Sequence, residues 1–258
     1  MNEIDFQIDS HHIGILTINR PHVHNALNWT AMQAFADAIE QAHEAAATLG
    51  RGLRALIITG AGPSFVSGGD INELQAYPTK EDGLRLATIM GNALARLEAL
   101  PCITIAAING PARGGGAEIA VACDLRVMDE VADIGFVQVR MGISTAWGGG
   151  QRLLRAIGYS LALELMATGR VISAADAFGL RLVNLVTAAG EACTAARHMA
   201  EQIAANPPDA TQAAKRILRF HQTHPGGSAF EAERAEFPGL WDTEFRREAV
   251  RKFLNRNK

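Results

Sequence analysis

The 258-residue chain has little cysteine, and neither sign of charge dominates. Its three cysteines, Cys102, Cys123 and Cys193, are far apart and lack CxxC spacing, so neither a disulfide framework nor a zinc site is predicted. The formal net charge of -3 gives no electrostatic reason to expect nucleic acid or an anionic membrane as the main partner. We therefore expect no metal, no nucleic acid and no membrane partner.

Long hydrophobic runs are also missing. No apolar segment approaches the roughly 18 residues of a membrane helix. Residues 1–5 show neither the basic nor the apolar region of a signal peptide. With 48% hydrophobic and 20% charged residues, the composition is that of a globular protein. The interpretation at this stage is a soluble cytoplasmic protein.

Several familiar catalytic motifs do not occur. The phosphate-binding pattern GxxxxGK[ST] is absent, and residues 60–65 lack the third glycine of a dinucleotide-binding fingerprint. The segment 142–146 matches the GxSxG pattern of serine hydrolases only in part. A redox cofactor and a serine nucleophile are therefore not predicted.

Alternating strands and helices are what the sequence does contain. The first half of the chain predicts a hairpin at 5–8 and 13–18, helices at 29–47 and 80–99, and buried strands at 53–59 and 102–108. The second half predicts a strand at 125–128, an extended passage at 133–142, a helix from 148–150 to Gly158, helices at 161–167 and 174–178, and a strand at 182–186. This alternation indicates an α/β fold with largely parallel strands.

The last quarter of the chain is expected to be helical, at 191–205, 211–220, 229–236 and 244–254. It carries several large apolar residues, namely Phe230, Phe237, Trp241, Phe245 and Phe253. Such residues suit either packing on the core or a subunit interface.

Two glycine-rich turns follow the two buried strands. The first contains Gly68-Gly69-Asp70, and the second runs from Gly114 to Glu118. In a parallel sheet both turns lie at the carboxyl ends of strands, where ligands bind. Glycine permits close backbone approach, and a helix N-terminus presents unpaired N–H groups, so an oxyanion could be held beside the Glu118 carboxyl group. The alternative is structural, because such turns often serve only tight packing and a first-turn glutamate often only complements the helix dipole.

Taken in order, the motifs resemble the crotonase superfamily, which contains the enoyl-CoA hydratases and isomerases. The matching stretches are Asn19-Arg20-Pro21, Asn25-Ala26-Leu27, Phe65 to Ile71, Asn109 to Asp124, Gly148-Gly149 with Gln151-Arg152-Leu153, and Ile172 to Val183. They span essentially the whole chain. The resemblance implies a spiral core of ββα turns at 1–195 and a C-terminal helical trimerisation region at 196–258. It also implies a homotrimer or a hexamer built from two trimers.

The resemblance also implies which residues form the site. An acyl-CoA thioester would be the substrate, with no cofactor beyond its coenzyme A. The N–H groups of Gly69 and Gly115 would form the oxyanion hole, and Glu118 would be the acid/base. The coenzyme A arm would lie along Ala26, Leu27, Ser67, Gly68, Asp70, Ile71, Asn72 and Gly114. Asp70 is expected to stabilise its turn rather than carry a proton.

Position 138 departs from the pattern of the family hydratases. Those enzymes hold a water molecule between two glutamates, and the second of these aligns with Gln138. A glutamine amide can orient a water or an acyl group but cannot shuttle a proton near neutral pH. The segment around Gln138 and Trp147 instead resembles the short-chain acyl-CoA decarboxylases of the family, such as the ethylmalonyl-CoA type. Trp147 would shape the acyl pocket, and Arg140 would either pair with an acyl carboxylate or, as we expect, lie at the surface.

Three hypotheses follow. The leading one is an enoyl-CoA hydratase/isomerase-family enzyme that uses an enolate held by an oxyanion hole, with Glu118 as acid/base. The alternative is a malonyl-type acyl-CoA decarboxylase, since loss of CO2 forms the enolate without a second base. The third is a non-catalytic trimer that binds acyl-CoA.

Overall fold

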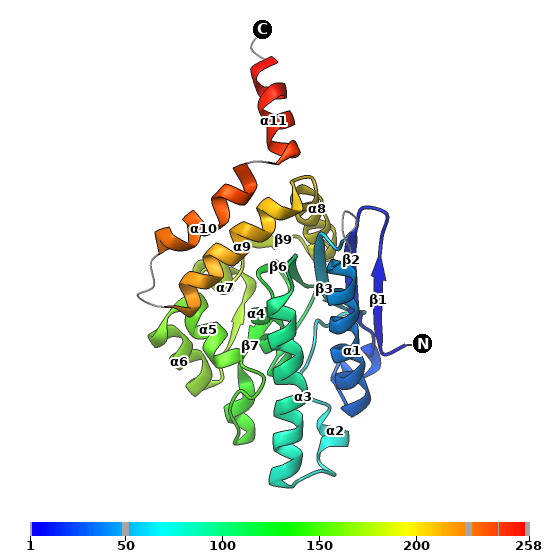
Figure 1. Ribbon diagram of the computed structural model, residues 1–258. Coiled ribbons are helices and arrows are strands. Elements are labelled where there is room, and N and C mark those ends of the chain that lie inside the picture. The colour runs from blue at the N-terminus through cyan, green and yellow to red at the C-terminus, as the bar shows by residue number, and fades with distance from the viewer. Residues whose placement is uncertain (1, 48–51, 225–228, 242, 256–258) are drawn as a thin grey trace.

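A six-stranded sheet organises the molecule (Figure 1). The computed structural model describes residues 2–47, 52–224, 229–241 and 243–255. The strand order is β1 (Ile4–Ile8), β2 (Ile13–Ile18), β3 (Ala55–Gly60), β4 (Ile103–Ile108), β6 (Leu125–Asp129) and β9 (Leu185–Thr187). Only β1 runs antiparallel to its neighbour, so the prediction of a largely parallel sheet in an α/β fold is confirmed.

Alternating side chains on the strands fill two hydrophobic layers. On β3, Leu56 and Ile58 face the larger core, which is completed by α1 (Trp29–Ala46), α3 (Lys80–Ala99) and α4 (Gly115–Ala122). Ala55 and Ile57 point to the opposite face, which is covered by α8 (Ala192–Ala204). The helix α8 meets the sheet through alanines, which let its backbone approach closely. Both faces of the sheet are therefore buried, as expected for parallel strands.

A second, smaller sheet contains β5 (Ala112–Arg113), β7 (Asp133–Gly135) and β8 (Val171–Ser173). The predicted extended passage at 133–142 is wrong beyond Gly135, because Val137–Met141 form a 3-10 helix. The strand β8, which pairs with β7, is only three residues long, so no strand among the described residues pairs with the chain beyond Gly135. Gly142 ends the 3-10 helix in a left-handed conformation with φ of 72°.

The two long helices α1 and α3 begin at side-chain caps that match their sequences. The Asn28 side chain accepts a hydrogen bond from the N–H of Ala31 at the start of α1, and Thr79 forms a capping box with Asp82 at the start of α3. The other elements are η1 (Pro21–Val23), α2 (Ile71–Leu74), α5 (Gly149–Ile157), α6 (Tyr159–Thr168), α7 (Ala174–Gly179), α9 (Pro208–Thr223), α10 (Ala229–Trp241) and α11 (Glu244–Asn255).

The C-terminal helices extend from one end of the body (Figure 1). The helix α10 lies along α9, and α11 projects away from the rest. Four of the predicted apolar residues are exposed, namely Phe230, Phe237, Trp241 and Phe245, whereas the Phe253 side chain lies outside the described part. The proposed division after residue 195 falls inside α8, whose Ala196 and Ala200 still pack on the sheet, and that division stays a prediction. No helix among the described residues is long and apolar enough to cross a membrane.

Candidate active site

Two asparagine amides, the buried one of Asn25 and the half-buried one of Asn109, hold together the loops that leave strands β2, β3 and β4. The Asn25 Nδ2 group donates to the carbonyl oxygens of Ala61, Ser64 and Phe65 at 2.8–3.1 Å. The Asn109 Nδ2 group donates to the Gly60 oxygen at 2.9 Å and also to that of Gly62. Because both amides donate to backbone carbonyls, the three loops are fixed relative to one another.

The segments 26–27 and 68–70 are further joined by backbone hydrogen bonds and one buried ion pair. The Leu27 N–H donates to the Gly68 oxygen at 2.8 Å, and the Asp70 N–H donates to the Leu27 oxygen at 2.9 Å. Arg20 donates to the Ala26 oxygen and pairs with Asp70 at 3.1 Å. Arg20 is a residue whose role sequence reasoning missed; its place in an Asn-Arg-Pro loop was the available signal.

The two glycine-rich turns touch through their backbones. A Cβ on Gly68, where φ is 100°, would lie 3.2 Å from the Gly115 nitrogen, and a Cβ on Gly116 would lie 1.9 Å from the Val66 oxygen. Among the described residues, neither the Gly69 N–H nor the Gly115 N–H donates a hydrogen bond to another residue. Two unused backbone donors therefore lie on adjoining turns, which is the arrangement that an oxyanion requires.

Glu118 is buried, and three donors already contact its carboxylate. Oε2 accepts from the N–H groups of Trp147 at 2.9 Å and Gly149 at 2.8 Å. Oε1 accepts from Gln138 Nε2 at 2.9 Å. A carboxylate has about four acceptor positions, so one remains on Oε1 that can accept a proton or a hydrogen bond from a water molecule.

Burial raises the pKa of Glu118, although the Gly149 and Trp147 N–H groups, the Gln138 amide and the Ala146 N–H group act in the opposite direction. A carboxyl group with a raised pKa is better suited to exchange protons near neutral pH than an ordinary glutamate. Among the charged groups on neighbouring elements, Arg152 and Glu98 pair with each other and Arg113 pairs with Asp133.

Trp147 packs directly against Gly115, and Gly149 packs directly against Glu118. A Cβ on Gly115 would lie 2.1 Å from the Trp147 ring, and a Cβ on Gly149 would lie 2.4 Å from Glu118 Cγ. The Trp147 side chain is itself buried. The site therefore has a floor built largely of backbone and one indole ring.

Gln138 carries an unusual feature besides its bond to Glu118. Its Oε1 atom is buried and has no hydrogen-bond partner. A buried acceptor without a partner is costly, so a donor on a bound molecule would stabilise it. The structure brings Gln138 and Glu118 into contact, while their predicted roles in catalysis stay predictions.

The other predicted site residues lie around this centre. Ile71 and Asn72 are exposed at the start of α2, and Ser67 Oγ donates to the Val23 oxygen at 3.4 Å. Gly114 precedes α4 with φ of 53°. Arg140 is exposed and packs against Gly169, so the structure does not bring it to Glu118 through any described contact. No group of three or more potential metal ligands occurs among the described residues.

Comparison with known proteins gives consistent matches along the chain. A sequence model of the enoyl-CoA hydratase/isomerase family matches residues 9–258. The chain is 34% identical over 247 residues to a short-chain-enoyl-CoA hydratase from Clostridium acetobutylicum, covering 95% of this chain and 92% of that protein. It is also 34% identical over 232 residues to an ethylmalonyl-CoA decarboxylase from Gallus gallus, covering 89% of this chain and 76% of that protein. A crystal structure of an enoyl-CoA hydratase from Bacillus anthracis superimposes with a TM-score of 0.92 at 31% identity, covering 99% and 97% of the two chains.

Proposed function

The chain belongs to the enoyl-CoA hydratase/isomerase family, and from this premise we propose that it transfers a proton on the acyl group of a coenzyme A thioester. The observation that supports this most directly is the buried Glu118 carboxylate, which keeps one acceptor position beside two unused backbone donors. The coenzyme A arm would follow the turns at 26–27 and 67–72. The exposed aromatic residues of α10 and α11 would serve a homotrimer or hexamer.

In the proposed reaction, the N–H groups of Gly69 and Gly115 hold the thioester oxygen as negative charge develops on it. Such a donor contributes about 3–4 kcal/mol to transition-state stabilisation. Glu118 takes a proton from water as the oxygen adds to Cβ, and then gives a proton to Cα. In an isomerase it would instead move one proton from carbon to carbon. A single carboxylate is sufficient for either sequence because it acts first as base and then as acid.

Gln138 would hold the attacking water in a hydratase. Its Nε2 group is engaged by Glu118, so the orphaned Oε1 is the atom that would accept a hydrogen bond from that water. The water would then donate to Oε1 of both side chains. Gln138 orients the nucleophile in this scheme and carries no proton.

A decarboxylase is the second candidate, favoured by the amide at position 138. The bond from Cα to the carboxylate breaks, CO2 leaves, and the electron pair forms the enolate, which then takes a proton at Cα. The raised pKa of Glu118 favours the protonated form that this last step needs. A protonated Glu118 would donate to Gln138 Oε1, which frees the amide nitrogen to hold the departing carboxylate.

Assays on three substrates in parallel test these proposals. Crotonyl-CoA would report hydration, a 3-enoyl-CoA isomerisation, and ethylmalonyl-CoA the release of CO2. For a hydratase or isomerase, we expect turnover of an enoyl ester and none of ethylmalonyl-CoA. For a decarboxylase, we expect CO2 from the wild type and hydration only in Gln138→Glu, because that change adds the second carboxylate. Tight binding of the esters without turnover of any of them would contradict both and favour a non-catalytic trimer.

The pH dependence gives a further prediction. In a hydratase or isomerase Glu118 must be ionised to act as base, so kcat/KM should fall as the pH drops through its raised pKa. The acidic limb of the profile should therefore lie above the ordinary range of a glutamate. A profile of kcat/KM against pH, measured in buffers of constant ionic strength, checks this, and a limb within the ordinary range would contradict it.

A further inference from the structure

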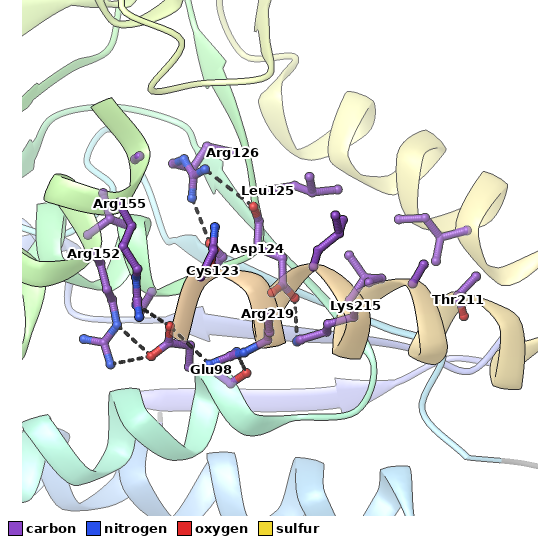
Figure 2. Close-up of a pocket in the computed structure, with 18 of the residues that line it drawn as sticks. Glu98, Cys123, Asp124, Leu125, Arg126, Arg152, Arg155, Thr211, Lys215 and Arg219 are labelled. Atoms are coloured by element: carbon purple, nitrogen blue, oxygen red, sulfur yellow. Dashed lines mark hydrogen bonds and ion pairs between the residues drawn. The ribbon is translucent and has the colours of Figure 1, made fainter. Parts of the chain in front are cut away.

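Glu98, near the end of α3, faces three arginines beside a cavity of about 450 Å³ (Figure 2). Its Oε1 pairs with Arg155 at 2.6 Å and with Arg219 at 3.2 Å, and its Oε2 pairs with Arg152 at 3.1 Å. The Arg152 side chain is only 3% exposed, whereas those of Arg155 and Arg219 are 24% and 29% exposed. Glu118 is not part of the cavity lining, so this cluster lies outside the proposed active site.

Arg152 differs from the other two arginines because it also contacts the loop before α5. Its Nη1 group donates to the Trp147 oxygen at 2.7 Å. A Cβ on Gly148 would lie 2.7 Å from the same Nη1 atom, so the guanidinium rests directly on the backbone of 147–148. The planar guanidinium can donate to Glu98 and to this carbonyl at once, which a lysine cannot do in the same geometry.

The opposite side of the same segment contacts Glu118. The N–H groups of Trp147 and Gly149 both donate to Glu118 Oε2. Residues 147–149 are therefore clamped between a buried guanidinium and a buried carboxylate. We propose that Arg152, anchored by Glu98, is a positioning residue that holds Trp147 and Gly149 so that their N–H groups point at Glu118. This inference rests on the proposed function only for what Glu118 does to the substrate.

Losing Arg152 should loosen two of the three donors to Glu118. Because those N–H groups lower the pKa of Glu118 against the effect of burial, their displacement would raise it further. The elements packed against α4 carry Arg152 and Arg155 on α5, Arg113 on β5, and, on α3, Lys80, Glu81, Asp82, Arg85, Arg96 and Glu98. Glu98 keeps two arginine partners in an Arg152 variant, so no buried carboxylate is left unpaired.

The test compares Arg152→Met and Arg152→Lys with Arg155→Met, which loses a partner of Glu98 but no described contact with 147–149. The fluorescence of Trp147 is followed against pH with Trp29 and Trp241 replaced by phenylalanine. Ionisation of Glu118 changes the charge 2.9 Å from the backbone nitrogen of Trp147, and Glu118→Gln identifies the transition by removing it. This readout needs no substrate, so it remains valid if the proposed function fails.

We expect the fluorescence midpoint to move to higher pH in Arg152→Met and to stay unchanged in Arg155→Met. On a substrate that the wild type turns over, kcat should fall about 10- to 100-fold in Arg152→Met with KM little changed. Arg152→Lys keeps the positive charge but not the planar fork, so its midpoint should also move upward. A wild-type midpoint in Arg152→Met, an equal shift in Arg155→Met, or full rescue by Arg152→Lys would overturn the proposal.

Discussion

Replacing Glu118 by glutamine is expected to lower turnover about 10²–10⁴-fold without destabilising the fold, because the amide cannot exchange a proton with the substrate. The amide oxygen of Glu118→Gln can keep the hydrogen bonds from Trp147 and Gly149. Its amide nitrogen can then donate to Oε1 of a flipped Gln138 amide, whose Nε2 loses the acceptor that Glu118 Oε1 supplies in the wild type. One amide atom of Gln138 therefore lacks a partner in either protein, so the change in hydrogen bonding should leave the stability of the site little changed.

At neutral pH, Glu118→Gln should have a higher free energy of unfolding than the wild type. The pKa of Glu118 is higher in the folded than in the unfolded state, so the folded state favours the neutral carboxyl group. The resulting contribution to the free energy of unfolding is fully present below the unfolded pKa and is lost as the pH rises through the folded pKa. Glu118→Gln has no such loss. Steady-state kinetics and thermal unfolding measure the two effects, with the exposed Glu130→Gln as control. Turnover within tenfold of wild type would show that Glu118 is not the proton carrier.

The second large effect is expected on folding, from adding one methyl group at Gly116. The Cβ of Gly116→Ala would lie 1.9 Å from the Val66 oxygen and 2.7 Å from the Val66 carbonyl carbon, so the backbones of two loops must separate. Such overpacking should cost about 3 kcal/mol of the free energy of unfolding. For a chain of this size, that corresponds to a fall in Tm of roughly 6–12 °C.

A matched glycine substitution is available on α3. A Cβ on Gly83 meets no atom within 4 Å, and the residue is exposed within the helix. Gly83→Ala should therefore raise the free energy of unfolding by about 0.5–1 kcal/mol, because alanine favours a helix over glycine. Thermal or denaturant unfolding of both variants tests the pair. Equal stability of Gly116→Ala and wild type would mean that the close contact with Val66 is not a constraint on the fold.

Local signals in the sequence were sufficient to predict most of the elements. The helix predicted at 80–99 is α3 to the residue, since its Thr79 cap and apolar period act within the segment itself. The passage at 133–142 was misjudged because its alternating residues suit a strand, whereas the partner strand β8 is too short to continue the pairing. The helix α9 begins at Pro208, three residues before the predicted start at 211, because proline is favoured in the first turn of a helix.

The site was predictable only in part, for a related reason. The resemblance and the rule for loops at strand ends brought Gly69, Gly115 and Glu118 together as candidates. Arg152 could not be assigned this way, because a single arginine in a helix usually lies in solvent and its partner Glu98 is 54 residues earlier. Contacts between distant segments depend on how the helices pack, which no local pattern encodes.

The backbone floor of the site limits how this protein can diverge. Gly115, Gly116 and Gly149 touch their neighbours so closely that side chains there would clash, so the backbone around Glu118 offers few positions for substitution. By contrast, Met141, the last residue of the 3-10 helix that contains Gln138, is exposed, and so is Ile143 on the loop that follows. Directed evolution toward a different acyl group or reaction should therefore find accepted changes at 138 and 141–146, while the glycine scaffold is inherited unaltered.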